Sequence, residues 1–219
     1  MTDPIVIAGI CRTPMGGFMG ELSTVAATEL GSIAIKGALV NASLKADDVD
    51  EVLMGCVLPA GLGQAPARQA ALGAGLPKSV PCTTINKVCG SGMKTVMMAH
   101  DAIAAGSSDI SVVGGMESMS LAPHIMPAGR TGTRLGHTMV YDHMMKDGLE
   151  DAYDVGRAMG TFAEETAQQY QFTREQQDAY AIESLRRANE AIDNNHFDGE
   201  IVPVTVKTRK GDIVVTKDE

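Results

Sequence analysis

The sequence contains no apolar run that approaches the roughly 18 residues needed to cross a membrane as a helix. It also lacks the positively charged start and apolar core of a secretory signal peptide, because the first residues lead directly into an apolar segment typical of a strand. These two absences predict a chain that is not exported and has no membrane partner.

Positive charge is scarce in this chain. Its 27 acidic and 18 basic residues give a net charge of −9 at pH 7. Proteins that bind nucleic acids present a clustered basic face. We therefore expect no nucleic-acid partner.

Cysteine is sparse, and its spacing excludes two classes of site. The four cysteines form no C-x-x-C pair and have no histidine at metal-ligand spacing; they are Cys11, Cys56, Cys82 and Cys89. A zinc site and a disulfide framework are therefore both excluded for a chain of this size. This pattern predicts no bound metal and a reducing, cytoplasmic location.

The first part of the 219-residue chain alternates apolar strand-like runs with helix-like segments. We expect strands over 4–10, 51–58, 82–85 and 109–113, and helices over 24–42, 67–75 and 93–105. Alternation of this kind favours right-handed β-α-β crossovers and a mainly parallel sheet covered by helices. We predict an α/β core domain over residues 1–119.

The composition and the hydrophobic periodicity of the sequence change near residue 120. Proline and glycine punctuate the chain to about residue 139, which predicts a long surface excursion. Two helices are expected next, over 161–171 and 174–194, followed by a hairpin with strands over 200–206 and 212–216. Thr173 and Gln176 form a capping box for the second helix, and its predicted buried stripe is Ala181, Leu185, Ala188 and Ile192. We predict a second unit over residues 120–219.

The most informative stretch is 86–93, in which Cys89 lies among glycines between a predicted strand and a predicted helix. The free N–H groups and the positive dipole end of a helix N-terminus favour a thiolate over a thiol. Gly90 and Gly92 leave room for a ligand carbonyl to reach the backbone amides. A single cysteine is more often a small buried apolar residue than a nucleophile. In this setting, between a strand and a helix and among glycines, the two interpretations carry equal weight.

The segment 86–92, with the sequence Asn-Lys-Val-Cys-Gly-Ser-Gly, resembles the acyl-enzyme cysteine motif of the thiolase family, whose members join or split acyl-CoA units. Other motifs of the family follow its order and spacing over nearly the whole chain: Cys11–Pro14, Gly63–Ala70, Gly114–Ser120 and Lys146–Leu149. The resemblance implies a thiolase-like α/β core over 1–119 and an α+β loop domain over 120–219 that holds coenzyme A.

The resemblance also implies roles for individual residues. Cys89 corresponds to the catalytic nucleophile, and Leu149 and Met159 fall where the family packs apolar side chains against the thioester arm. Ala158 stands where bacterial biosynthetic thiolases often have a histidine, which leaves the preferred acyl chain open. Five basic residues of the second unit are expected to be solvated: Arg130, Arg134, Lys207, Arg209 and Lys210.

The family's remaining catalytic residues are a histidine in Gly-His-Pro, an asparagine in Asn-Glu and a second cysteine in Cys-Gly-Gly. Neither Gly-His-Pro nor Cys-Gly-Gly occurs in residues 1–219, and the pair Asn-Glu occurs only at Asn189–Glu190, inside the helix expected over 174–194. We therefore expect that this chain is the N-terminal half only, with the second core domain absent, and that a C-terminal half supplies these residues. The resemblance implies coenzyme A thioesters as substrates, no cofactor, and a homodimer or homotetramer.

The main interpretation is an acetoacetyl-CoA-forming or -cleaving acyltransferase, incomplete as this fragment. The first alternative is a degradative 3-ketoacyl-CoA thiolase of fatty-acid β-oxidation, which uses the same cysteine chemistry. The alternative of another class is a non-catalytic CoA-binding or assembly subunit. A ketoacyl synthase is disfavoured by the loop-domain likeness after residue 120.

Overall fold

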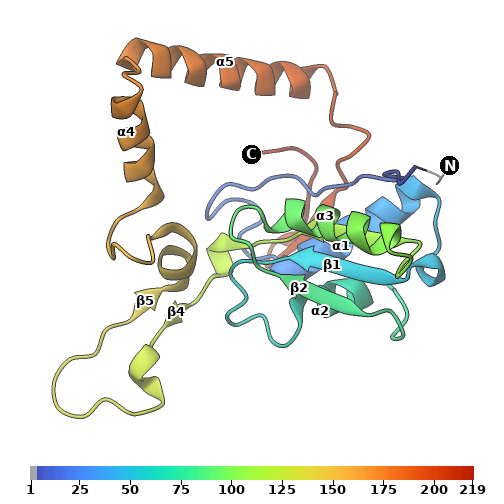
Figure 1. Ribbon diagram of the computed structural model, residues 1–219, viewed down its shortest axis with the longest axis horizontal. Coiled ribbons are helices and arrows are strands. Elements are labelled where there is room, and N and C mark those ends of the chain that lie inside the picture. Colours follow the sequence, from blue (N-terminus) through green and yellow to red (C-terminus); the bar gives the residue numbers. More distant parts are fainter. Residues whose placement is uncertain (1–3) are drawn as a thin grey trace.

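A three-stranded parallel sheet lies at the centre of the molecule (Figure 1). The structure, a computed structural model, describes residues 4–219, so the first three residues of the predicted 1–119 domain lie outside the described part. The central strand β1 (Glu51–Gly55) pairs in parallel with β2 (Cys82–Ile85) and with β3 (Ser111–Gly115). The predicted parallel sheet is therefore confirmed, and the carboxyl ends of all three strands meet at one edge.

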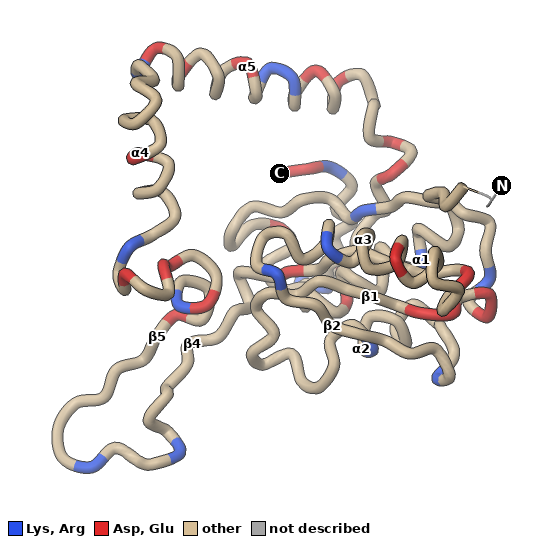
Figure 2. The backbone as a smooth tube through the Cα atoms, viewed as in Figure 1, with Lys and Arg blue, Asp and Glu red and all other residues tan. Residues whose placement is uncertain are grey.

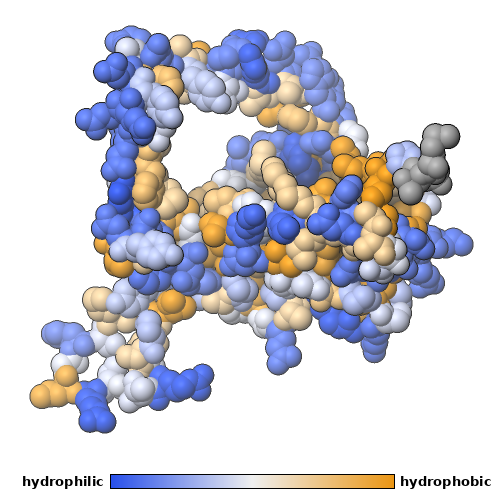
Figure 3. Space-filling model, viewed as in Figure 1, coloured by the Kyte–Doolittle hydropathy of each residue, from blue (hydrophilic) through white to orange (hydrophobic). Residues whose placement is uncertain are grey.

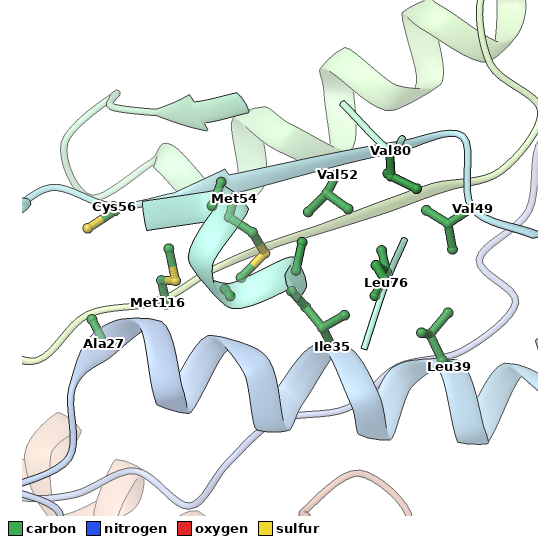
Figure 4. Packing of buried hydrophobic residues seen from close by; sticks show 13 residues of the cluster. Ala27, Ile35, Leu39, Val49, Val52, Met54, Cys56, Leu76, Val80 and Met116 are labelled. Carbon is green, nitrogen blue, oxygen red and sulfur yellow. The ribbon is translucent and has the colours of Figure 1, made fainter. Parts of the chain in front are cut away.

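Helices cover both faces of this sheet. On one face, α1 (Ala27–Ala42) and α2 (Pro66–Gly73) enclose the main apolar core with β1. Figure 4 shows Val52 and Met54 of β1 pointing toward Ile35 and its neighbours on α1. The opposite face of β1 packs against α3 (Ser91–Ala104). The core thus fixes β1 rigidly beneath the start of α3.

Helix α3 presents its apolar side outward. The residues that it buries are small, namely Ser91, Thr95 and Ala99. Met93, Val96 and Met97 are 68%, 43% and 50% exposed. Small residues let the helix approach the sheet closely, so the large side chains are left on the far side.

The segment 4–10 was predicted to be a buried strand, and this prediction is wrong. The segment runs extended along α1 without pairing to β3, and Val6 and Ile7 are 71% and 74% exposed. A strand needs a neighbouring strand for its backbone N–H and C=O groups, and within residues 4–219 none lies beside this segment. Its apolar side chains therefore stay largely exposed within the described part of the chain.

Arg12 joins this N-terminal segment to the end of the chain. Its guanidinium contacts the carboxylates of Glu200 and Asp218, each at 2.6 Å, and lies 4.9 Å from the ring centre of Phe197. The hydrogen bond from Arg12 holds the pKa of Asp218 below its ordinary value. The connection brings residues about two hundred positions apart into one cluster.

The second half of the chain extends away from the sheet (Figure 1). Strands β4 (His124–Ile125) and β5 (Tyr141–Asp142) form a short antiparallel pair, followed by a π-helix at Met145–Leu149. Helices α4 (Met159–Gln169) and α5 (Arg174–Asp193) then form an arch, and Figure 3 shows open space between this arch and the body. The hairpin of β6 (Val204–Thr208) and β7 (Gly211–Val215) returns to the body.

The capping box predicted for α5 is confirmed. The Gln176 N–H donates to Thr173 Oγ1 at 3.2 Å, and the Thr173 N–H donates to Gln176 Oε1 at 2.9 Å. The predicted buried stripe is wrong, because α5 buries no residue and Leu185 is 63% exposed. Period alone cannot show whether another element covers a helix face, and within residues 4–219 no element buries a residue of this one.

The five basic residues that were predicted to be solvated are exposed. Arg130 and Arg134 lie in the loop between β4 and β5, where Figure 2 shows basic positions far from the body. Lys207, Arg209 and Lys210 lie at the turn of the terminal hairpin. No helix within residues 4–219 combines the length and the apolarity that a membrane crossing requires.

Candidate active site

Cys89 lies between the end of β2 and the first residue of α3, as the sequence predicted. Gly90 occupies the N-cap position of the helix, so the cysteine directly precedes it. Cys89 is exposed, whereas Cys56 is buried and both Cys11 and Cys82 are half-buried. Among the four thiols, this one is the most accessible to a ligand.

A network of hydrogen bonds fixes the turn that carries Cys89. Ser91 Oγ accepts from the Lys87 N–H at 2.8 Å and donates to the Val88 carbonyl at 2.6 Å. Asn86 Oδ1 accepts from the Val88 N–H at 2.9 Å. Val88 has a φ of 47°, a left-handed conformation that is costly for a β-branched residue. The three bonds hold this strained residue in place, and sequence reasoning missed the roles of Asn86 and Ser91.

Replacing Ser91 with alanine is expected to lower the free energy of unfolding by about 1–2 kcal/mol, because the Lys87 N–H loses its acceptor. Urea denaturation measures this change. The matched control is Ser107→Ala, since Ser107 is exposed and makes no side-chain hydrogen bond to residues 4–219. Equal effects of the two substitutions would contradict the proposed role of the Ser91 hydroxyl.

Glycines at the strand ends let the start of α3 sit directly on the sheet. A Cβ on Gly55 would lie 2.7 Å from Ser91 Cβ and 2.9 Å from the Gly92 nitrogen. On the neighbouring strand β3, a Cβ on Gly115 would lie 3.4 Å from Gly92 Cα. The motif 114–120 signalled Gly115, but nothing in the sequence singled out Gly55. Only glycine allows this approach of helix to strand.

Two backbone donors at the start of α3 are free among residues 4–219. Within residues 4–219, no acceptor pairs with the N–H of Cys89 or with that of Gly92. The N–H groups at a helix start have no intrahelical partner, and they stabilise negative charge on a nearby oxygen. The site therefore provides the kind of donors that an oxyanion hole requires.

Cys89 opens onto a cavity of about 410 Å³. Leu58, Met116, Met119 and Leu149 contribute apolar walls, and Gly92 also lines the cavity. Cys89 and Leu149 thus line the same cavity. Met159, at the start of α4, is 44% exposed and does not line this cavity.

Glu117 fixes one wall of the cavity, and sequence reasoning did not assign it a role. Its carboxylate accepts from the N–H groups of Val57 at 2.8 Å and Leu58 at 3.1 Å, and Cys56 Sγ lies 3.7 Å away. Hydrogen bonds to a charged acceptor are among the stronger ones in proteins. The carboxylate therefore orders the segment that follows β1.

Burial of Cys56, with the nearby Glu117 carboxylate, raises the pKa of its thiol to about 12. Burial likewise raises the pKa of Cys11 and of Cys82. A raised pKa keeps these three thiols protonated and weakly nucleophilic near neutral pH. They are poor candidates for covalent chemistry.

The raised pKa of Cys56 predicts a loss of stability at high pH. The folded chain keeps this proton to about pH 12, whereas the unfolded chain releases it near 9.0, so raising the pH between these values favours unfolding. Relative to Cys56→Ser, the wild type should lose up to about 1.4 kcal/mol per pH unit there. Parallel pH profiles in urea denaturation would contradict this expectation.

Histidine and metal-ligand clusters are missing around the thiol. No histidine of residues 4–219 lines the Cys89 cavity. In the described part of the chain, no group of three or more His, Cys, Asp or Glu side chains is placed to hold a metal ion. The described residues therefore place an accessible thiol and free backbone N–H groups here, but no histidine.

Comparison with known proteins agrees with this arrangement. The sequence model of the family described as "Thiolase, N-terminal domain" matches residues 5–219. The chain is 56% identical over 218 residues to "Acetyl-CoA acetyltransferase 1" of Arabidopsis thaliana, which covers 98% of this chain and 52% of that protein. It is 51% identical over 217 residues to "Acetyl-CoA acetyltransferase" of Cupriavidus necator, covering 99% of this chain and 55% of that protein.

A mitochondrial acetyl-CoA acetyltransferase of Bos taurus is 50% identical over 218 residues, which is 99% of this chain and 51% of that protein. The chain thus spans about half the length of these curated relatives. The family match covers nearly the whole chain and confirms what the motifs indicated. By this evidence the chain belongs to the thiolase family and represents its N-terminal domain.

Proposed function

We propose that this chain carries the acyl-cysteine chemistry of an acetyl-CoA C-acetyltransferase, which forms or cleaves acetoacetyl-CoA. One observation supports this most directly: the exposed thiol of Cys89 opens onto an apolar cavity beside two free backbone N–H groups. The relatives that carry the name acetyl-CoA acetyltransferase agree with this activity.

In the first half-reaction the thiolate of Cys89 attacks the carbonyl carbon of an acyl-CoA. A new carbon–sulfur bond forms, the carbonyl electron pair moves onto oxygen, and collapse of this intermediate expels the thiolate of coenzyme A. The free N–H groups of Cys89 and Gly92 stabilise the oxyanion. The products are an acyl-cysteine and coenzyme A, so no oxidant, metal or further cofactor takes part.

Leu149 contacts the thioester arm in this proposal, since it lines the cavity that Cys89 opens onto. Met159 serves the same arm only if the start of α4 moves toward the cavity when coenzyme A binds. Residues 120–219 act as the loop domain that holds coenzyme A. Ala158 leaves the acyl chain less restricted than a histidine would.

The second half-reaction needs a base that removes an α-proton from a second acetyl-CoA. We assign that role to a second cysteine in a C-terminal half of the protein, together with a histidine that activates the nucleophile and an asparagine that helps to hold the thioester oxygen. The outward apolar face of α3, formed by Met93, Val96 and Met97, supports such a covering partner. Strand β2 is an edge of the sheet, which suits a homodimer or homotetramer in the cytoplasm.

The test is to mix the 219-residue chain with acetyl-CoA and measure its intact mass. We expect addition of one acetyl group, located on Cys89 by peptide mapping. The same chain should show no thiolysis of acetoacetyl-CoA, because it lacks the second-step base. Acetylation elsewhere, or full turnover, would overturn this assignment.

A further inference from the structure

The π-helix beside the Cys89 cavity is held by a polar pair, the buried His143 and the half-exposed Asp147. The π-helix Met145–Leu149 supplies Gly148 and Leu149 to the cavity lining, and Met144 precedes it there. A Cβ on Gly148 would lie 3.4 Å from Leu58 Cδ2, so this π-helix, the roof of the cavity, rests directly on the wall that follows β1. The contact between the π-helix and this wall therefore fixes the position of Leu149 in the cavity lining.

His143 lies at that junction and has no part in the chemistry described above. It is 5% exposed, and its backbone N–H donates to the Pro123 carbonyl at 3.1 Å. Its Nδ1 lies 2.6 Å from Asp147 Oδ2 within the π-helix, and its Nε2 lies 3.4 Å from the Ala60 nitrogen in the wall. One imidazole therefore connects the roof to the wall.

The partners decide which nitrogen carries the proton. A backbone N–H can only donate, so Nε2 must present its lone pair to Ala60. The carboxylate of Asp147 can only accept, so Nδ1 must carry the hydrogen. The contacts fit the neutral Nδ1–H tautomer, since the Nε2–H form would set two donors against each other.

We propose that His143, as this neutral tautomer, is a positioning residue that holds the π-helix and its Leu149 over Cys89. The proposal rests on the proposed function, because it gives the roof the task of retaining the thioester arm of acyl-CoA. Glu117 fixes Val57 and Leu58 from the sheet side, and His143 fixes Ala60 from the roof side. Retention of the substrate then depends on two contacts of the segment after β1, one with Glu117 and one with His143.

The first measurement is the rate of Cys89 acetylation in the 219-residue chain against acetyl-CoA concentration. For His143→Leu we expect the half-saturating concentration to rise about tenfold, since both hydrogen bonds are lost. The limiting rate and the iodoacetamide alkylation of Cys89 should stay within about twofold, because the thiol turn is untouched. His143→Gln, which offers an acceptor and a donor, should recover most of the loss.

The matched control is His137→Leu, the same change at an exposed histidine in the loop between β4 and β5. Equal half-saturating concentrations for His137→Leu and His143→Leu would overturn the proposal. A parallel fall in acetylation and alkylation would also overturn it, because that result indicates general damage. Failure of His143→Gln to recover binding would count against it as well.

A second measurement is independent of activity. Nitrogen NMR of the wild-type chain at neutral pH, with the His143 signal assigned by its loss in His143→Gln, reports the tautomer. We expect protonated Nδ1 and unprotonated Nε2; the opposite tautomer or an imidazolium overturns the proposal. Should the wild type show no acetylation at all, the proposed function fails, while the NMR result still decides the state of the pair.

Discussion

Replacing Cys89 with alanine should abolish acetyl transfer from acetyl-CoA to the chain, lowering the labelling rate by more than about a thousandfold. Alanine removes the sulfur that forms the covalent bond, and no other exposed thiol exists among residues 4–219. Intact-mass analysis over time gives the rate. Because the exposed position demands no packing, the variant should unfold at the same urea concentration as the wild type.

The control for this result is Cys82→Ala. Cys82 begins β2, seven residues earlier, and burial raises the pKa of its thiol. Its removal should leave the acetylation rate within about twofold of wild type. Labelling that survives in Cys89→Ala and disappears in Cys82→Ala would transfer the nucleophile to the other cysteine and refute the assignment.

Replacing Gly55 with alanine should lower the free energy of unfolding by about 3 kcal/mol. The new Cβ would meet Ser91 Cβ at 2.7 Å, the Ser91 carbonyl carbon at 2.8 Å and the Gly92 nitrogen at 2.9 Å. Backbone atoms cannot turn aside as a flexible side chain can, so the start of α3 must move. We also expect acetylation of Cys89 to slow at least about tenfold, because the free N–H of Gly92 moves with it.

Gly160→Ala is the matched control for Gly55→Ala. Gly160 lies in α4, and a Cβ there would have no atom within 4 Å in the described part of the chain. Alanine is a better helix former than glycine, so this change should stabilise the chain by up to about 1 kcal/mol. A Gly55→Ala variant as stable as wild type would contradict the close approach of strand and helix.

Local sequence signals predicted the elements that position the site. Strand β2, the start of α3 and the capping box of α5 all lie where their local patterns placed them. Each depends on neighbours within a few residues: a short apolar run, glycines before a helix, or a threonine three residues before a glutamine. Such signals stay valid whatever lies elsewhere in the molecule.

The sequence was misleading where burial depends on a distant partner. The segment 4–10 and the stripe of α5 have the apolar patterns of buried elements, and both are exposed among the described residues. A pattern records that a face is suited to burial, but it does not say which element covers it. The apolar face of α3 is likewise exposed among the described residues, and its pattern does not say which element covers it.

By itself, the sequence determined the family and singled out Cys89 as the proposed nucleophile, because the residues around Cys89 are contiguous and their order carries the signal. The tertiary structure alone decided what surrounds that thiol. Three residues reach the site from separate parts of the chain: Gly55, Glu117 and His143. Strand pairing places Gly55, a hydrogen bond to the Val57 N–H places Glu117, and a contact with the Ala60 nitrogen places His143. Contacts between residues far apart in sequence leave no periodic or local trace, so only the folded arrangement reveals them.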